Sequence, residues 1–202
     1  PLCCGRTYIS YGQLDKASKE LNRFNDYIIN NNYFNLPVVG IEPSCLLTFN
    51  DEYQKLKNVN NREKIKNKFY LLEEFILEQI KNDNKVKTNK FDQNVLIHGH
   101  CHQKSQDRMK GLTNLLSELK INNKMIDSSC CGMAGSFGYD SKNYEVSKKM
   151  ANLSLIPAIN NSDEADFIIA NGTSCRHQIS DLSHKKGKHV SELLFKIFET
   201  VN

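Results

Sequence analysis

The chain has 202 residues, of which 39% are hydrophobic and 25% charged, and its formal net charge at pH 7 is +4. This length suits one domain or two small similar halves with buried cores. The 27 basic and 23 acidic residues are spread along the chain, which argues against a nucleic-acid partner. No apolar run reaches the roughly 20 residues of a transmembrane helix. We expect a cytoplasmic protein, free or bound peripherally to the inner face of the membrane.

Short apolar runs alternate with longer segments of helical periodicity, which is typical of βαβ units on a parallel sheet. We predict an α/β fold of two similar Rossmann-like βαβ halves, residues 1–84 and 93–202, related by an approximate twofold and joined by a polar linker. In the first half the pattern predicts a helix over 13–33, a strand over 37–41, a helix beginning near Ser44 and a long helix over 62–81.

The second half repeats this alternation of strands and helices. The predicted strands span 95–97, 124–126 and 167–170, and the predicted helices span about 109–119, 142–160 and 190–198. The chain begins with Pro1 rather than methionine, so we expect it to be part of a longer polypeptide.

Two Cys-Cys-Gly triplets are each followed by a single cysteine, and one further cysteine precedes the second triplet. The seven positions are Cys3, Cys4, Cys45, Cys101, Cys130, Cys131 and Cys175. An odd number of cysteines in a chain long enough to form a core argues against a disulfide framework. Each cysteine lies past the end of a predicted strand or in a loop before a helix, where open α/β sheets gather ligand sites. The pattern predicts metal ligation or redox chemistry.

Polar residues beside these cysteines are further candidates for the site. They are His98, His100, His102, Arg176 and His177. Each histidine can tune a metal cluster through hydrogen bonds, supply a ligand or relay protons, or instead cap a helix or fill the core. The arginine and the last histidine either place positive charge near a cluster or belong to a helix-surface ion pair.

Five segments, in order, resemble one known family. They are Cys3-Cys4-Gly5-Arg6, Gly40-Ile41-Glu42-Pro43-Ser44-Cys45, His98-Gly99-His100-Cys101-His102-Gln103-Lys104, Cys130-Cys131-Gly132-Met133-Ala134-Gly135-Ser136-Phe137-Gly138-Tyr139, and Ser174-Cys175-Arg176-His177-Gln178-Ile179. Together they resemble the cysteine-rich CCG domain of heterodisulfide reductase and of the glycolate oxidase iron–sulfur subunit. The strongest resemblance is to the C-terminal region of fused FAD-linked oxidase/iron–sulfur oxidoreductases that act on D-2-hydroxy acids such as D-lactate or D-2-hydroxyglutarate. It covers almost the whole chain.

The family motif consists of one cysteine, then Cys-Cys-Gly, then Cys-x-x-Cys, and its cysteines hold iron–sulfur clusters. This sequence departs from the motif at the first position of each Cys-x-x-Cys, where it has Glu42 and Gly172. The second half keeps four cysteines, at positions 101, 130, 131 and 175, which is the number that a [4Fe-4S] cluster uses. A tetrahedral zinc ion also binds four cysteines. The resemblance implies an iron–sulfur cluster, with zinc as the alternative in the isolated fragment.

The first half forms a less complete site. Its cysteines are Cys3, Cys4 and Cys45, and the upstream cysteine of the family motif does not occur in the chain. A fourth ligand would be Glu42, a solvent molecule or a group from an upstream segment.

The resemblance implies a role in electron transfer. A flavin-binding domain of the same longer polypeptide would oxidise the hydroxy acid with FAD, and this part would relay electrons to an acceptor such as a quinone. We find no flavin-binding pattern here, so we do not expect the chain alone to oxidise a hydroxy acid. The alternative is a structural zinc-binding or interaction domain that has lost redox activity.

Overall fold

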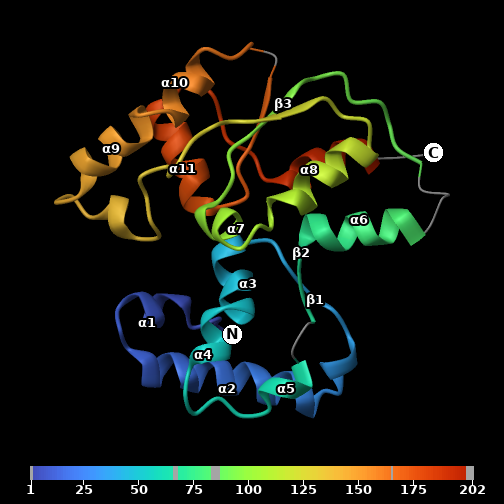
Figure 1. Ribbon diagram of the computed structural model, residues 1–202, viewed down its shortest axis with the longest axis vertical. Helices are drawn as coiled ribbons and strands as arrows, with labels where there is room; N and C mark the ends of the chain where they lie inside the picture. Colours follow the sequence, from blue (N-terminus) through green and yellow to red (C-terminus); the bar gives the residue numbers. More distant parts are fainter. Residues whose placement is uncertain (1, 66–67, 83–86, 165, 199–202) are drawn as a thin grey trace. The chain divides into compact units, whose positions relative to one another are not determined.

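The computed structural model describes residues 2–65, 68–82, 87–164 and 166–198. The chain divides into two compact units, residues 1–72 and 73–202. Each unit combines helices with a small parallel sheet, so the predicted α/β class is confirmed at this level (Figure 1). Residues 73–82, which lie within the predicted first half, belong to the second unit.

The first unit packs its helices around a two-stranded parallel sheet. Its elements are α1 (Arg6–Ser10), α2 (Leu14–Asn30), the 3-10 turn η1 (Tyr33–Asn35), β1 (Val38–Gly40), α3 (Pro43–Asn50), α4 (Glu52–Lys55), α5 (Arg62–Ile65) and β2 (Phe69–Leu71). The apolar face of α2 buries Ala17 and Leu21, as its spacing predicts. In the core, the rings of Phe49 and Phe69 stack with their centroids 4.5 Å apart.

The predicted long helix over residues 62–81 is wrong. Its centre contains strand β2, which pairs in parallel with β1 so that Phe69 lies opposite Val38. Phe69 and Leu71 are buried on either side of the half-buried Tyr70, and this alternation suits a strand. The apolar spacing of this segment fits both structures, and the hydrogen bonds offered by the distant β1 favour the strand. Residues 66–67 lie outside the described part of the chain.

The second unit contains a three-stranded parallel sheet with the strand order β4-β3-β5. Its elements are α6 (Leu72–Asn82), β3 (Val95–Ile97), α7 (Cys101–Ser105), α8 (Met109–Glu118), β4 (Asn123–Met125), η2 (Phe137–Tyr139), α9 (Tyr144–Asn152), α10 (Leu155–Asn160), β5 (Phe167–Ile169), α11 (Thr173–Leu182) and α12 (Val190–Phe198). The predicted helix over 142–160 is interrupted between α9 and α10. The helices α7 and α11 were not predicted. Of the predicted linker, residues 82–92, residues 83–86 lie outside the described part.

The cysteines of the second unit follow the carboxyl ends of the three strands. Cys101 comes shortly after β3, the pair Cys130 and Cys131 after β4, and Cys175 after β5. Because the strands are parallel, their carboxyl ends meet at one edge of the sheet. The sheet therefore brings together three segments that are far apart in the sequence.

Candidate metal centre

The four thiols of the second unit form a continuous series of side-chain contacts. The Cys101 thiol is close enough to interact with Cys130, Cys130 with Cys131, and Cys131 with Cys175. Cys101 is the first residue of α7, and Cys175 lies in the first turn of α11. The structure thus brings the four predicted cysteines together, while their role as ligands stays a prediction.

The interior of this site combines two thiols with an imidazole. Cys131 and Cys175 are each 2% exposed, and His98 is 1% exposed. A ring nitrogen of His98 and the sulfurs of Cys131 and Cys175 all lie within 4.8 Å of one another. Sulfur and imidazole donors suit zinc and iron–sulfur clusters. These residues therefore fit a buried metal centre.

The thiols share protons unequally because they are so close together. The Cys101 thiol, and then the Cys131 thiol, hold the pKa of Cys130 well below its usual value. The neighbouring Cys131 thiol, together with nearby imidazoles, lowers the pKa of Cys175 to about 5 against the effect of burial. Cys130 in turn raises the pKa values of Cys101 and Cys131. A cation among the thiols would offset this mutual repulsion and favour four thiolates.

Both Cys-Cys-Gly triplets have the same local backbone arrangement. The Gly132 N–H donates to Cys130 Sγ at 3.2 Å, and the Gly5 N–H donates to Cys3 Sγ at 3.4 Å. Both glycines have positive φ, 89° for Gly132 and 73° for Gly5, which side chains disfavour. A Cβ at Gly132 would also lie 2.1 Å from the carbonyl oxygen of Ser147. Glycine is needed to aim the N–H at the sulfur.

The thiols of the first unit are more exposed. The Cys4 thiol is close enough to interact with Cys45 and with Cys3, but Cys3 and Cys45 are exposed. The contact with Cys45 lowers the pKa of Cys4 to about 6, and the contact with Cys4 raises that of Cys45. Glu42 caps α3 by accepting from the N–H and the hydroxyl of Ser44, at 3.3 and 2.8 Å. Its role as a ligand stays a prediction.

The imidazole of His100 fills the space beside Gly172, the position at which the family motif has a cysteine. A Cβ built on Gly172 would lie 2.4 Å from His100 Cδ2 and 3.2 Å from Cys175 Sγ. His100 also caps α7, because its Nδ1 accepts from the His102 N–H at 3.2 Å. The site thus holds an imidazole where the motif would place a thiol.

The two residues that follow Cys175 support the neighbouring loops. Arg176 donates to the carbonyl oxygens of Ala170 and Asn171, at 3.0 and 2.6 Å. Nδ1 of His177 lies 2.6 Å from the hydroxyl of Tyr139, and both residues are exposed. Arg176 therefore orders the loop before Cys175 through hydrogen bonds to the backbone.

Sequence reasoning missed the buried polar residues around the site. Ser128 bonds the Nδ1 of His98 at 2.9 Å, and Lys104 donates to the carbonyl oxygens of Ser128 and Ser129. The buried carboxyl of Glu73 accepts hydrogen bonds from Gln103, in the helix that carries Cys101, and from Asn171, in the loop before Cys175. A serine between a predicted strand and the cysteine pair is a signal that could have suggested Ser128.

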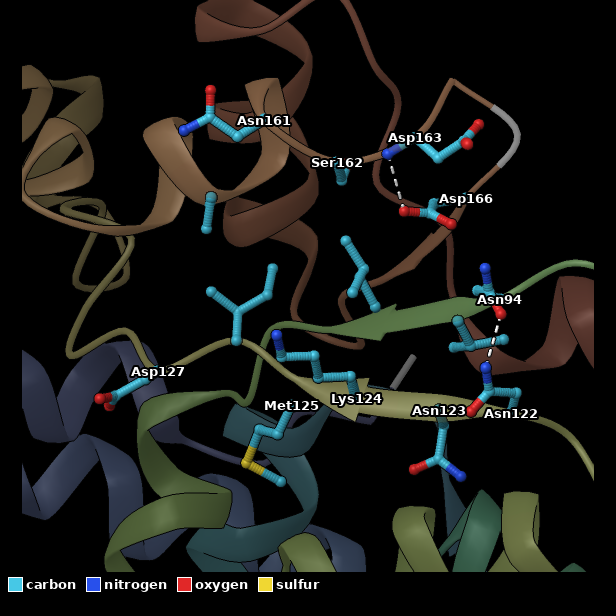
Figure 2. A pocket seen from close by; sticks show the side chains of 14 residues that line it. Asn94, Asn122, Asn123, Lys124, Met125, Asp127, Asn161, Ser162, Asp163 and Asp166 are labelled. Atoms are coloured by element: carbon cyan, nitrogen blue, oxygen red, sulfur yellow. Dashed lines mark hydrogen bonds between the residues drawn. The ribbon is translucent and has the colours of Figure 1, made fainter.

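A separate pocket lies at the β4 edge of the sheet in the second unit (Figure 2). It has a volume of about 730 Å³ and is lined by residues that include Asn94, Asn122, Lys124, Asp127 and Asp163. No cysteine is among the described residues that line it. The pocket is therefore distinct from the thiol cluster.

Comparison with known proteins agrees with this geometry. Residues 95–180 match the family model of the CCG cysteine-rich domain. The predicted resemblance is thus confirmed, and the matched segment contains all four cysteines of the second-unit cluster.

Curated relatives extend the similarity over most of the chain. A subunit of the anaerobic glycerol-3-phosphate dehydrogenase of Escherichia coli K12 is 24% identical over 194 residues, which cover 95% of this chain and 48% of that protein. The D-2-hydroxyglutarate dehydrogenase of Pseudomonas putida is 23% identical over 163 residues, covering 80% of this chain and 15% of that protein. The D-2-hydroxyglutarate dehydrogenase of Haemophilus influenzae is 24% identical over 198 residues, which cover 93% of this chain and 19% of that protein.

The chain therefore spans about half the length of the first of these relatives and a smaller share of the others. No solved structure shows significant similarity to it. Within the described part of the chain, no helix is both long and apolar enough to cross a membrane.

Proposed function

We propose that the second unit binds an iron–sulfur cluster through Cys101, Cys130, Cys131 and Cys175, and that the chain is the electron-transfer part of an FAD-linked dehydrogenase. The observation that carries this proposal is the series of contacts that links the four thiols at one edge of the sheet. A bound cluster would supply one-electron redox chemistry. The chain would contribute the thiolates, the Gly132 N–H and the burial of the centre.

The relatives support a role shared by enzymes with different substrates. Their names refer to glycerol-3-phosphate and to D-2-hydroxyglutarate, yet most of this chain aligns with both. A region that both kinds of dehydrogenase share is best suited to a reaction step that does not depend on the substrate. Passing electrons from a flavin-binding domain to an acceptor such as a quinone is such a step. The substrate in our proposal is a D-2-hydroxy acid, of the D-lactate or D-2-hydroxyglutarate type.

The two halves of the chain, residues 1–84 and 93–202, would each descend from one CCG motif with Rossmann-like βαβ topology and be related by an approximate twofold. The matching N–H to sulfur contacts of Gly5 and Gly132 support this duplication. In the same way, Cys45 and Cys175 both lie in the first turn of a helix that follows a parallel strand. Cys4 then corresponds to Cys131.

Spectroscopy tests the proposed cofactor. Anaerobically purified protein should show the broad visible absorption of an iron–sulfur cluster and, in its paramagnetic oxidation state, an electron paramagnetic resonance signal. Stoichiometric zinc with neither feature would favour the structural alternative. Zinc remains chemically reasonable because the same four thiolates suit a tetrahedral ion.

Kinetics in the longer polypeptide test electron transfer. Cys131→Ser should leave flavin reduction by the hydroxy acid largely intact, because the flavin would receive the hydride elsewhere. Steady-state turnover with a quinone or dye should fall strongly. Stopped-flow flavin bleaching measures the first step, and an equal loss in both measurements would indicate a structural role.

A further inference from the structure

His98 combines one hydrogen-bonded ring nitrogen with one buried ring nitrogen that has no hydrogen-bond partner among the described residues. Its Nδ1 lies 2.9 Å from Ser128 Oγ, whereas its Nε2 is buried and has no partner of hydrogen-bond geometry among the described residues, although the Cys175 thiol is close enough to interact with the ring. A buried polar atom without a partner costs free energy unless something bonds to it. The unpartnered Nε2 thus suggests that a group absent from the protein chain completes this site.

The surroundings of His98 indicate what this group is. A ring nitrogen of His98 forms a triangle with the sulfurs of Cys131 and Cys175, and no side is longer than 4.8 Å. Metal–ligand bonds of about 2.0–2.3 Å place the donors of a tetrahedral ion about 3.5 Å apart. A small inward movement of these three side chains would bring them to that separation. The triangle therefore has the size expected for a metal-binding site in its metal-free form.

The hydrogen bond to Ser128 also favours ligation by His98. Histidine ligands usually donate the N–H of one ring nitrogen to a neighbour, which leaves the lone pair of the other nitrogen for the metal. With Ser128 Oγ accepting from Nδ1–H, the Nε2 of His98 carries a lone pair. Ser128 is itself held in place, since Lys104 donates to its carbonyl oxygen.

His100 has the opposite arrangement. Its Nδ1 accepts from the backbone N–H of His102 at 3.2 Å. In the neutral ring the proton then resides on Nε2, so this nitrogen is a donor rather than a ligand. The two histidines of this short loop therefore differ in what their Nδ1 atoms contact, a side-chain hydroxyl for His98 and a backbone N–H for His100.

We infer that His98 is a metal ligand of the second-unit centre, binding through Nε2 alongside Cys131 and Cys175. The inference rests on the proposed function for the identity of the metal group, but not for the existence of the nitrogen ligand. The centre is then a mixed sulfur and nitrogen site rather than one held by cysteines alone. His100 lies beside it as a hydrogen-bond donor.

Isotope labelling tests the nitrogen ligand in the wild-type protein. Protein carrying ¹⁵N-histidine or ¹⁴N-histidine is reconstituted anaerobically with iron and sulfide, and pulsed electron paramagnetic resonance is recorded on the reduced centre. We expect a strong nitrogen coupling that changes with the isotope and persists in His100→Gln but disappears in His98→Gln. A cluster without such coupling in the wild type would overturn the inference while leaving the proposed function intact.

Cobalt provides a test that does not depend on cluster assembly. Co²⁺ is added anaerobically to metal-free protein, and its affinity is measured from the sulfur-to-metal charge-transfer absorption. Loss of a ligand in His98→Gln should weaken binding by at least the 10- to 100-fold typical of lost outer-shell partners, whereas His100→Gln should cost less. If no cluster forms but His98→Gln weakens Co²⁺ binding, the proposed function fails and the inference stands. Equal Co²⁺ affinity in wild type and His98→Gln would refute the inference.

Discussion

The buried carboxyl of Glu73 leads to a quantitative prediction about stability. Glu73 is 1% exposed, and its Oε1 accepts from Gln103 Nε2 at 2.7 Å and from Asn171 Nδ2 at 3.0 Å. Burial raises the pKa of Glu73 from 4.5 to about 7, with a smaller contribution from the charge of Glu74. The carboxyl thus joins the helix that carries Cys101 to the loop before Cys175, but its ionisation opposes folding.

The pKa shift determines the pH range and the size of the effect. Because the folded protein holds the proton more tightly than the unfolded chain, the associated stability is fully present below about pH 4.5 and is lost as the pH rises through 7. At 1.36 kcal/mol per pKa unit, the loss is about 3 kcal/mol. Glu73→Gln keeps the shape and the oxygen acceptor but cannot ionise. Its stability relative to the wild type should therefore rise by about 3 kcal/mol between pH 4.5 and pH 8.

Urea unfolding of metal-free, reduced protein at several pH values measures this difference. Comparing the change between the two pH values removes any constant cost of the substitution, such as a weaker acceptor for the Glu73 backbone N–H. Glu78→Gln is the matched control, because Glu78 is exposed on the same helix α6. A stability difference between wild type and Glu73→Gln that does not vary with pH would refute the reasoning. It would mean that water or a cation solvates the carboxylate.

Two further predictions concern the triplets. Gly132→Ala should destabilise the protein by at least about 2 kcal/mol, since its Cβ would lie 2.1 Å from a carbonyl oxygen at positive φ, whereas Gly135→Ala has open space and should cost only about 1 kcal/mol. Urea unfolding compares the two variants, and similar losses would contradict the packing argument. In metal-free protein, the exposed Cys3 and Cys45 should be alkylated faster than the buried Cys131, as time-resolved mass spectrometry would show. Equal rates would mean that the second-unit site opens readily.

Local sequence patterns predicted the helices and strands whose ends are indicated by a change from polar to apolar residues. The strand over 95–97 and the helix over 190–198 were predicted with the observed bounds, because each is an apolar segment with polar residues before it. Strand β2 was missed because its partner, β1, lies some thirty residues earlier in the chain, and only pairing with it distinguishes strand from helix there. Helix α7 was missed because its cap is a histidine, His100, rather than a typical capping residue.

The same distinction between local and distant information applies to the site. The convergence of the four cysteines was predictable because parallel strands place their carboxyl ends at one sheet edge. The environment of Glu73 could not be predicted, because its partner Asn171 lies far along the chain and nothing near Glu73 in the sequence signals burial. The unpartnered nitrogen of His98 was likewise hidden, because it depends on which ring nitrogen Ser128 engages.

The two triplets show how one backbone motif can support sites of different strength. In both, a glycine N–H points at the sulfur of the first cysteine, so the local geometry is the same. What differs is the enclosure: Cys131 and Cys175 are buried, whereas Cys3 and Cys45 are exposed. Hydrogen bonds and solvent exposure together set the potential of an iron–sulfur centre. If the second unit holds the cluster, the feature that distinguishes this unit from the first is the burial of its cysteines and not its Cys-Cys-Gly triplet. A cluster in the first unit would need further residues to enclose it.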